Sequence, residues 1–237
     1  MRRILPLFVR FGLTLGAAAG LSPAAAGTLT VNPVLVEIGT ARRAGSVTVQ
    51  NVENVPVTIR AYSLAWSQTD GADRYDETSA VIVSPPVFTI PAGGTQIVRV
   101  GLRQPSAAPQ SYRLIIEEVP AAQPGNGIRV ALRLNLPLYW NLAAGPQSDI
   151  AWSAARLADG QWALEARNGG AGWVRIDPAA AQRATGITLE SGFGFGTVLP
   201  GSVRRWPIGA NPRIGDDARF QQIVSGTNGA APPPHAR

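Results

Sequence analysis

The 237-residue chain contains no cysteine and only one histidine, His235, which lies close to the C-terminus. Without cysteine the chain can form no disulfide, no thiolate nucleophile and no cysteine-ligated zinc or iron–sulfur site. A single histidine nearly excludes a Ser-His-Asp triad and a multi-histidine metal site. We therefore expect no catalytic residues, no metal and no cofactor.

Lysine is also missing, so all 21 basic residues are arginine, against 15 acidic residues and a net charge of +6. Arg2, Arg3 and Arg10 lie in the first 26 residues, which contain no acid, so a net charge of 6 − 3 = +3 belongs to the rest of the chain. That charge is too small and too dispersed to predict nucleic-acid binding. The arginine preference is explained by GC-rich codon usage, although arginine also matches carboxylates well.

Residues 1–26 have the pattern of a cleavable signal peptide. Arginines follow Met1, an apolar stretch covers 11–21, and Ala24–Ala26 provides a cleavage site of small residues. The apolar stretch is about half as long as a membrane span requires, which makes a membrane anchor the weaker interpretation. The sequence predicts export to the periplasm and no stable membrane insertion.

The remaining sequence is rich in turn formers, with 26 glycines and 20 prolines in the whole chain. Short apolar or alternating segments lie between these turns at spacings typical of an immunoglobulin-like β-sandwich. The expected strands of a first domain over 27–143 are 28–38, 46–51, 55–67, 81–83, 87–90, 95–102, 111–119 and 128–140. A second all-β sandwich is expected over 146–225, followed by a disordered Gly/Ala/Pro-rich tail over 226–237.

The segment 127–140 has the most regular pattern in the chain. Six aliphatic residues recur at every second position from Ile128 to Leu138, so in a strand they share one face. An ordinary half-buried strand is one interpretation. An edge strand that lends its aliphatic row to another protein is the other, and Pro137 favours it because proline is confined to strand edges and ends.

Several motifs together resemble the periplasmic chaperones of the chaperone–usher pilus pathway. They are LTVNPVLVE (29–37), SPPVFTIPAG (84–93), SYRLIIEEVP (111–120), the alternating segment and VLPGS (198–202). Each motif is weak alone, but their order and spacing extend over nearly the whole chain after residue 27.

The resemblance implies two immunoglobulin-like domains in a boomerang arrangement, with no enzymatic activity. Such a protein binds a pilus or fimbrial subunit in a 1:1 complex, completes the subunit's sandwich with its own strand, and delivers it to an outer-membrane usher. By position, the donor residues would be Ile128, Val130, Leu132, Leu134 and Leu136.

One feature departs from the best-known branch of that family, which anchors the subunit's C-terminal carboxylate with an Arg and a Lys. Pro33 and Pro137 stand at those positions, so this chain resembles the archaic branch close to the spore-coat-U-associated systems. Arg113 is the first candidate for a different anchor, because a charge within a strongly apolar strand needs a partner. Arg99 and Arg129 come next. For each of these arginines, the alternative to an anchor is a solvated side chain or an internal salt bridge. Glu117 or Glu118 would be the internal partner of Arg113.

Two other functions remain open. A secreted adhesive or carbohydrate-binding protein with two such domains would use exposed tryptophans as stacking platforms, and an exported hydrolase would use Asp and Glu. The acids near Gly71 are Asp70, Asp73, Asp76 and Glu77. Their spacing does not match an EF-hand loop, and we expect them in an exposed hairpin.

Overall fold

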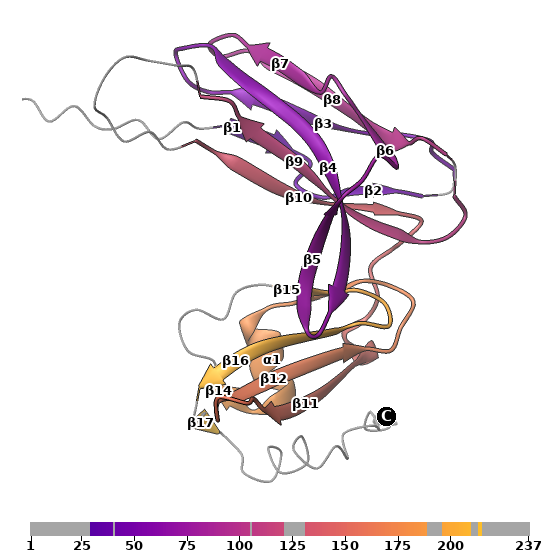
Figure 1. Ribbon diagram of the computed structural model, residues 1–237, viewed down its shortest axis with the longest axis vertical. Coiled ribbons are helices and arrows are strands. Elements are labelled where there is room, and N and C mark those ends of the chain that lie inside the picture. Colours follow the sequence, from indigo (N-terminus) through magenta and orange to yellow (C-terminus); the bar gives the residue numbers. More distant parts are fainter. Residues whose placement is uncertain are drawn as a thin grey trace, which may run out of the picture.

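The computed structural model describes residues 29–39, 41–104, 106–120, 131–188, 196–209 and 213–214. Two β-rich domains lie at an angle to each other, and a hairpin formed by β4 (Val57–Thr69) and β5 (Ala72–Glu77) extends from the first domain onto the second (Figure 1). The prediction of an all-β protein with two immunoglobulin-like sandwiches is confirmed. The expected signal peptide over 1–26 and the tail over 226–237 lie outside the described residues.

The described part of the first domain contains ten strands. They are β1 (Leu29–Asn32), β2 (Val36–Ile38), β3 (Gly45–Asn51), β4 (Val57–Thr69), β5 (Ala72–Glu77), β6 (Val81–Ser84), β7 (Val87–Ile90), β8 (Thr95–Leu102), β9 (Gln110–Glu118) and β10 (Arg133–Trp140). One sheet has the order β1-β3-β8-β6, and the other has the order β2-β10-β9-β4-β5 with β7 also paired to β4. The alternating residues of both sheets bury one shared core, which includes Val47, Val49, Val98, Val100, Ile59, Leu114, Ile116 and Leu138.

The opening segment differs from its prediction. A single strand is expected over 28–38, but the structure contains two: β1 pairs with β3 in one sheet, and β2 pairs with β10 in the other. The break falls at Pro33, which has no N–H to donate to a ladder. Because the chain changes sheets here, β2 covers only the last part of β10, and this exposes the rest of that strand's edge.

The second domain contains the strands β11 to β17, one 3₁₀ turn and one α-helix. The elements are η1 (Gln147–Asp149), β11 (Ile150–Arg156), β12 (Trp162–Asn168), β13 (Val174–Ile176), α1 (Pro178–Thr185), β14 (Ile187–Thr188), β15 (Gly196–Val198), β16 (Val203–Gly209) and β17 (Arg213–Ile214). Its sheets are β11-β12-β16, β13-β15 and β14-β17. Residues 215–225, the end of the expected second sandwich, lie outside the described residues.

The helix α1 is missing from the sequence-based prediction, although its signals are present. Asp177 is the N-cap and accepts a hydrogen bond from the Ala180 N–H (2.6 Å), Pro178 occupies the first turn, and Gly186 ends the helix at φ 72°. An N-terminal Asp-Pro and a C-terminal Gly mark a helix well. The helix was not predicted because segments with a strand pattern lie on both sides of these signals.

Each domain secures one loop with a buried asparagine at the end of a strand. The Asn51 amide donates to the carbonyls of Val55, Ile90 and Pro91, and its Oδ1 accepts the Glu53 N–H. Asn168 repeats this arrangement in the second domain, with bonds to Gly172, Val198 and Gly170.

Replacing Asn51 with alanine should lower the free energy of unfolding by about 3 kcal/mol. The change leaves backbone groups without partners in a region where water cannot replace them, at roughly 1–3 kcal/mol for a buried unsatisfied group. Urea denaturation followed by circular dichroism measures the effect, and Gln50→Ala on the exposed face of the same strand is the control. Equal stability of the two variants would contradict this prediction.

Candidate functional site

The described strands leave one edge of the first domain's larger sheet partly uncovered. Strand β10 pairs with β9 along its whole length, from Arg133 opposite Glu117 to Trp140 opposite Gln110. On its other side, β2 pairs only with Leu138, Tyr139 and Trp140. Among the described residues, no strand therefore pairs with the second edge of β10 from Arg133 to Pro137. Free N–H and C=O groups at such an edge are a template for another strand.

The aliphatic row of β10 runs from the core of the domain toward this open end. Leu136 is buried in the domain's own core, and Leu134 is half-buried against the same core. Leu132 lies just before the strand and is half-buried, and its carbonyl accepts a hydrogen bond from the Glu118 N–H (2.9 Å). Ile128 and Val130, the other expected donor residues, lie outside the described residues. Since Leu136 already packs inside the domain, it is not available to a partner.

A cleft of about 500 Å³ lies between the two domains, beside the C-terminal half of the open edge. Pro137, Leu136 and Asn135 of β10 line it on the first domain, and Trp173 and Thr197 line it on the second. Among the described residues, three arginines (Arg113, Arg175 and Arg204) but a single acid, Asp73, contribute to its walls. The cleft is therefore positively charged and suits an anion.

Arg113 projects from β9 into this cleft. Its guanidinium carbon lies 3.6 Å from the ring centroid of Trp66 and 5.7 Å from that of Tyr75. Its Nε is buried and has no hydrogen-bond partner. No ion pair joins Arg113 to any acid of the described ranges. A half-buried cation that has no ionic partner among the described residues favours the binding of an external anion.

The other anchor candidates are placed elsewhere or not described. Arg99 is exposed on β8, in the opposite sheet, and lines a separate cleft with Arg42 and Pro33. Arg129 lies outside the described residues. The expected internal partners do not hold Arg113 either, because Glu117 pairs with Arg60 (2.9 Å) and accepts from Tyr62 (3.1 Å). Glu118 forms no ion pair with a described residue.

An aromatic stack joins the two domains behind the cleft. Tyr139 of β10 is fully buried between Trp66 (5.8 Å between ring centroids) and Trp173 (5.0 Å). Trp173 belongs to the second domain, and its Nε1 donates to Glu37 of β2 (3.0 Å). Burial raises the pKa of Tyr139 to about 12, so its hydroxyl stays protonated at neutral pH. The stack gives the cleft a rigid wall.

The acidic hairpin is only partly the exposed loop expected from the sequence: Asp70, Asp76 and Glu77 are exposed, but Gly71 and Asp73 are not. The turn at Asp70 and Gly71 is confirmed by positive φ angles of 54° and 80°, but it lies against the second domain. The Gly71 carbonyl accepts the Arg205 N–H (2.8 Å), and a Cβ at Gly71 would lie 2.6 Å from the Cβ of Arg205. Asp73 is also mostly buried, since only 13% of its side chain is exposed. The covering of Gly71 and Asp73 was not predicted, because sequence pattern cannot show that another domain packs against this part of the hairpin.

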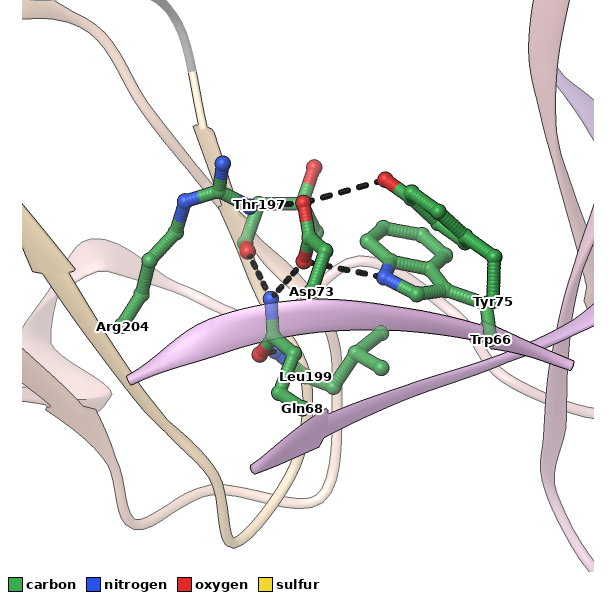
Figure 2. Close-up of polar contacts among 7 residues, drawn as sticks. All are labelled: Trp66, Gln68, Asp73, Tyr75, Thr197, Leu199 and Arg204. Carbon is green, nitrogen blue, oxygen red and sulfur yellow. Dashed lines mark hydrogen bonds and ion pairs between the residues drawn. The ribbon is translucent and has the colours of Figure 1, made fainter. Parts of the chain in front are cut away.

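Four donors surround the Asp73 carboxylate (Figure 2). They are Trp66 Nε1 (3.0 Å), Gln68 Nε2 (2.8 Å), the Tyr75 hydroxyl (3.1 Å) and the guanidinium of Arg204, which comes from β16 of the second domain. Burial alone raises the pKa of Asp73, but the bonds from Gln68 and Trp66 and the charge of Arg204 outweigh it and lower the pKa. The carboxylate is therefore ionised at neutral pH.

The lowered pKa predicts a pH-dependent contribution of Asp73 to stability. A carboxylate with a lowered folded-state pKa stabilises the fold above its unfolded-state pKa, near 3.9, and loses this effect as the pH falls through the folded-state value. Asp73→Asn should therefore lower the free energy of unfolding by about 2 kcal/mol at pH 7, the range of bonds to charged groups. The difference from wild type should shrink at pH 3. Urea denaturation at both pH values tests this, and an equal difference at both would contradict it.

Within the described ranges, no group of acidic or histidine side chains is arranged to hold a metal ion. No described helix has the length and apolar character to cross a membrane.

Comparison with known proteins gives a family for the first domain. Residues 28–142 match the model for the pili and flagellar-assembly chaperone, PapD N-terminal domain. A comparison with curated proteins finds no match.

Solved structures with the same fold are pilus chaperones and their complexes. A chain from the CsuC–CsuE chaperone–tip adhesion subunit complex of the archaic Csu pili of Acinetobacter baumannii has a TM-score of 0.61 at 22% identity, covering 79% of this chain and 97% of that one. The E. coli chaperone DraB has a TM-score of 0.53 at 15% identity, covering 80% and 92%. The Salmonella enterica SafA pilin–SafB chaperone complex gives 0.52 at 14%, covering 81% and 94%. At these identities the structures establish the two-domain fold, and the family model shows the relationship of the first domain: residues 28–142 belong to the PapD-like chaperones of pilus assembly.

Proposed function

We propose that this protein is a periplasmic chaperone that holds one pilus or fimbrial subunit along the open edge of β10 and delivers it to an outer-membrane usher. The observation that supports this most directly is the edge from Arg133 to Pro137, which no described strand covers. An added strand would gain backbone hydrogen bonds there, as in other cases of strand addition. The chain's resemblance to the archaic branch, with Pro33 and Pro137 at the usual anchor positions, belongs to the same proposal.

The donor row is Ile128, Val130, Leu132 and the accessible part of Leu134. These residues continue the line of Leu136 and Leu138, which fill the chaperone's own core. A subunit that lacks its last strand exposes a hydrophobic groove, and each aliphatic residue buried in it contributes roughly 1.5–3 kcal/mol. The same alternating row would thus fill the hydrophobic groove of the subunit with its first residues and the core of the chaperone's first domain with its last ones.

The inter-domain cleft would bind the C-terminal carboxylate of the subunit, with Arg113 as its anchor. This site lies beside the β10 edge, and it offers a guanidinium without an ionic partner among the described residues. Arginine matches a carboxylate with two parallel hydrogen bonds. The donor strand would then supply affinity, and the anchor would fix the register of the bound strand.

The adhesive or carbohydrate-binding alternative is less well supported. All six tryptophans lie in described segments, and each is buried or half-buried. A sugar-stacking platform would need an aromatic ring open to solvent. The described part of the chain offers no such tryptophan.

Co-expression with a candidate subunit encoded beside an usher gene tests the proposed function. We expect a soluble 1:1 complex to purify from the periplasm, and the subunit alone to aggregate or be degraded. If the subunit is equally soluble without the chaperone and no complex forms, the proposal is wrong.

A further inference from the structure

The Arg113 guanidinium is held in place by aromatic rings and not by a carboxylate. Its closest described partner is the Trp66 indole at 3.6 Å, with Tyr75 at 5.7 Å. Stacking on a ring leaves the N–H groups at the edge of the guanidinium free for an anion. An arginine side chain has about 2 kcal/mol of rotamer entropy to lose on binding, so a site that orders it beforehand binds more tightly.

Asp73 controls the orientation of both rings. Its Oδ1 accepts from Trp66 Nε1, and its Oδ2 accepts from the Tyr75 hydroxyl (Figure 2). The last torsion of an aromatic side chain has a broad energy profile and needs a contact of this kind to define it. One carboxylate therefore sets the positions of the two surfaces against which Arg113 lies.

The remaining acceptor capacity of Asp73 is used by Arg204 of the second domain and by Gln68 of β4. Arg204 binds Oδ2, and Gln68 binds Oδ1. Gln68 also spans the domains, because its amide donates to the Thr197 carbonyl (2.7 Å) and its Oε1 accepts the Leu199 N–H (2.9 Å). Asp73 lines the cleft, and its ion pair is with Arg204 and not with Arg113.

We propose that Asp73 is the positioning residue of the anion site: it fixes Trp66 and Tyr75 against Arg113 and links this arrangement to the second domain through Arg204. This inference rests on the proposed function, in which Arg113 anchors the subunit's carboxylate. It adds that the anchor works only when both domains are in place around Asp73.

The order of the Arg113 side chain tests the proposal directly. The ¹⁵N relaxation of its Nε–H should give an order parameter near that of rigid backbone, about 0.85, in the wild-type chain. Asp73→Asn should lower it below about 0.6, the range of flexible groups. Asp76→Asn makes the same change at an exposed position of the same strand, and it should leave the value unchanged.

Two further variants separate ring positioning from domain tethering. Tyr75→Phe removes only one of the ring contacts with Asp73 and should lower the order parameter partially; Tyr75 is 40% exposed, so this variant should fold. Gln68→Ala removes the bonds to Thr197 and Leu199 and one of the bonds to Asp73. It leaves both rings bonded to Asp73, so it should preserve the order of Arg113. An unchanged order parameter in both Asp73→Asn and Tyr75→Phe, or a mobile Arg113 in the wild type, would overturn the proposal.

Subunit binding shows which of the two proposals fails, if one does. Asp73→Asn should weaken capture of a co-expressed subunit about tenfold, while Asp76→Asn should not. If Arg113→Ala leaves capture unchanged, the anchor assignment is wrong whatever the order parameters show. If Arg113→Ala weakens capture but Asp73→Asn does not, the anchor is right and the positioning role of Asp73 is wrong.

Discussion

The double variant Val130→Asp, Leu132→Asp should lose its subunit almost completely, with affinity at least about 1,000-fold below wild type. Two buried aliphatic side chains contribute about 3–6 kcal/mol together, and each tenfold change in affinity corresponds to 1.4 kcal/mol. An aspartate forced into an apolar groove adds the cost of removing its charge from water. Co-purification from the periplasm, followed by a competition assay with the purified complex, measures the loss.

The structure provides a matched control for this variant. Ala131 is exposed and lies between the two donor positions, so Ala131→Asp adds the same charge on the opposite side of an extended chain. We expect it to keep most of the affinity. Leu136→Asp is unsuitable, because this residue is buried in the chaperone's own core. If the double variant folds normally and still holds the subunit, the donor assignment is wrong.

Arg113→Ala should weaken subunit capture about 100-fold without unfolding the chaperone. Losing one partner of a buried, hydrogen-bonded charge pair costs roughly 2–5 kcal/mol in binding. The free chaperone should keep its stability, because no described acid pairs with Arg113 and its Nε forms no hydrogen bond. Arg113→Lys should recover only part of the affinity, since lysine can neither stack flat on Trp66 nor bind a carboxylate with a planar fork.

Arg99→Ala is the control for the anchor. Arg99 lies exposed on β8 in the other sheet, away from the inter-domain cleft. A loss of capture in Arg99→Ala, with Arg113→Ala unaffected, would move the anchor to that face. Unfolding of Arg113→Ala in the absence of subunit would instead indicate a structural role for this arginine.

The sequence was sufficient to predict most of the strands. The predicted strand over 95–102 coincides with β8, and the one over 111–119 is shifted by one residue from β9. The alternation of apolar and polar residues at period two depends on local geometry alone, because successive side chains of a strand point to opposite faces. The break at Pro33 and the helix α1 had local signals as well, but neighbouring strand patterns outweighed them.

The sequence also singled out Arg113 and the aliphatic row, but not the cleft residues Arg175 and Arg204 of the second domain. Arg113 stood out because a charge in an apolar strand needs a partner, and this holds without knowing the fold. That Glu117 pairs with Arg60 depends on which strand lies beside β9, and local sequence does not record that. The same limit applies to Leu136, since its membership of the alternating row is visible in the sequence and its burial is not.

The amino-acid sequence by itself determined the strand pattern, the aliphatic row and the lack of the side chains needed for histidine or cysteine chemistry, because each follows from residue types and short spacings. Only the tertiary structure decided that β10 has an open edge and that Asp73 lies inside a contact between domains. Both depend on residues far apart in the chain. Among the described strands, β2 pairs only with the last three residues of β10 and leaves the rest of that edge uncovered. Asp73 is covered because it binds Arg204, which lies 131 positions later in the chain.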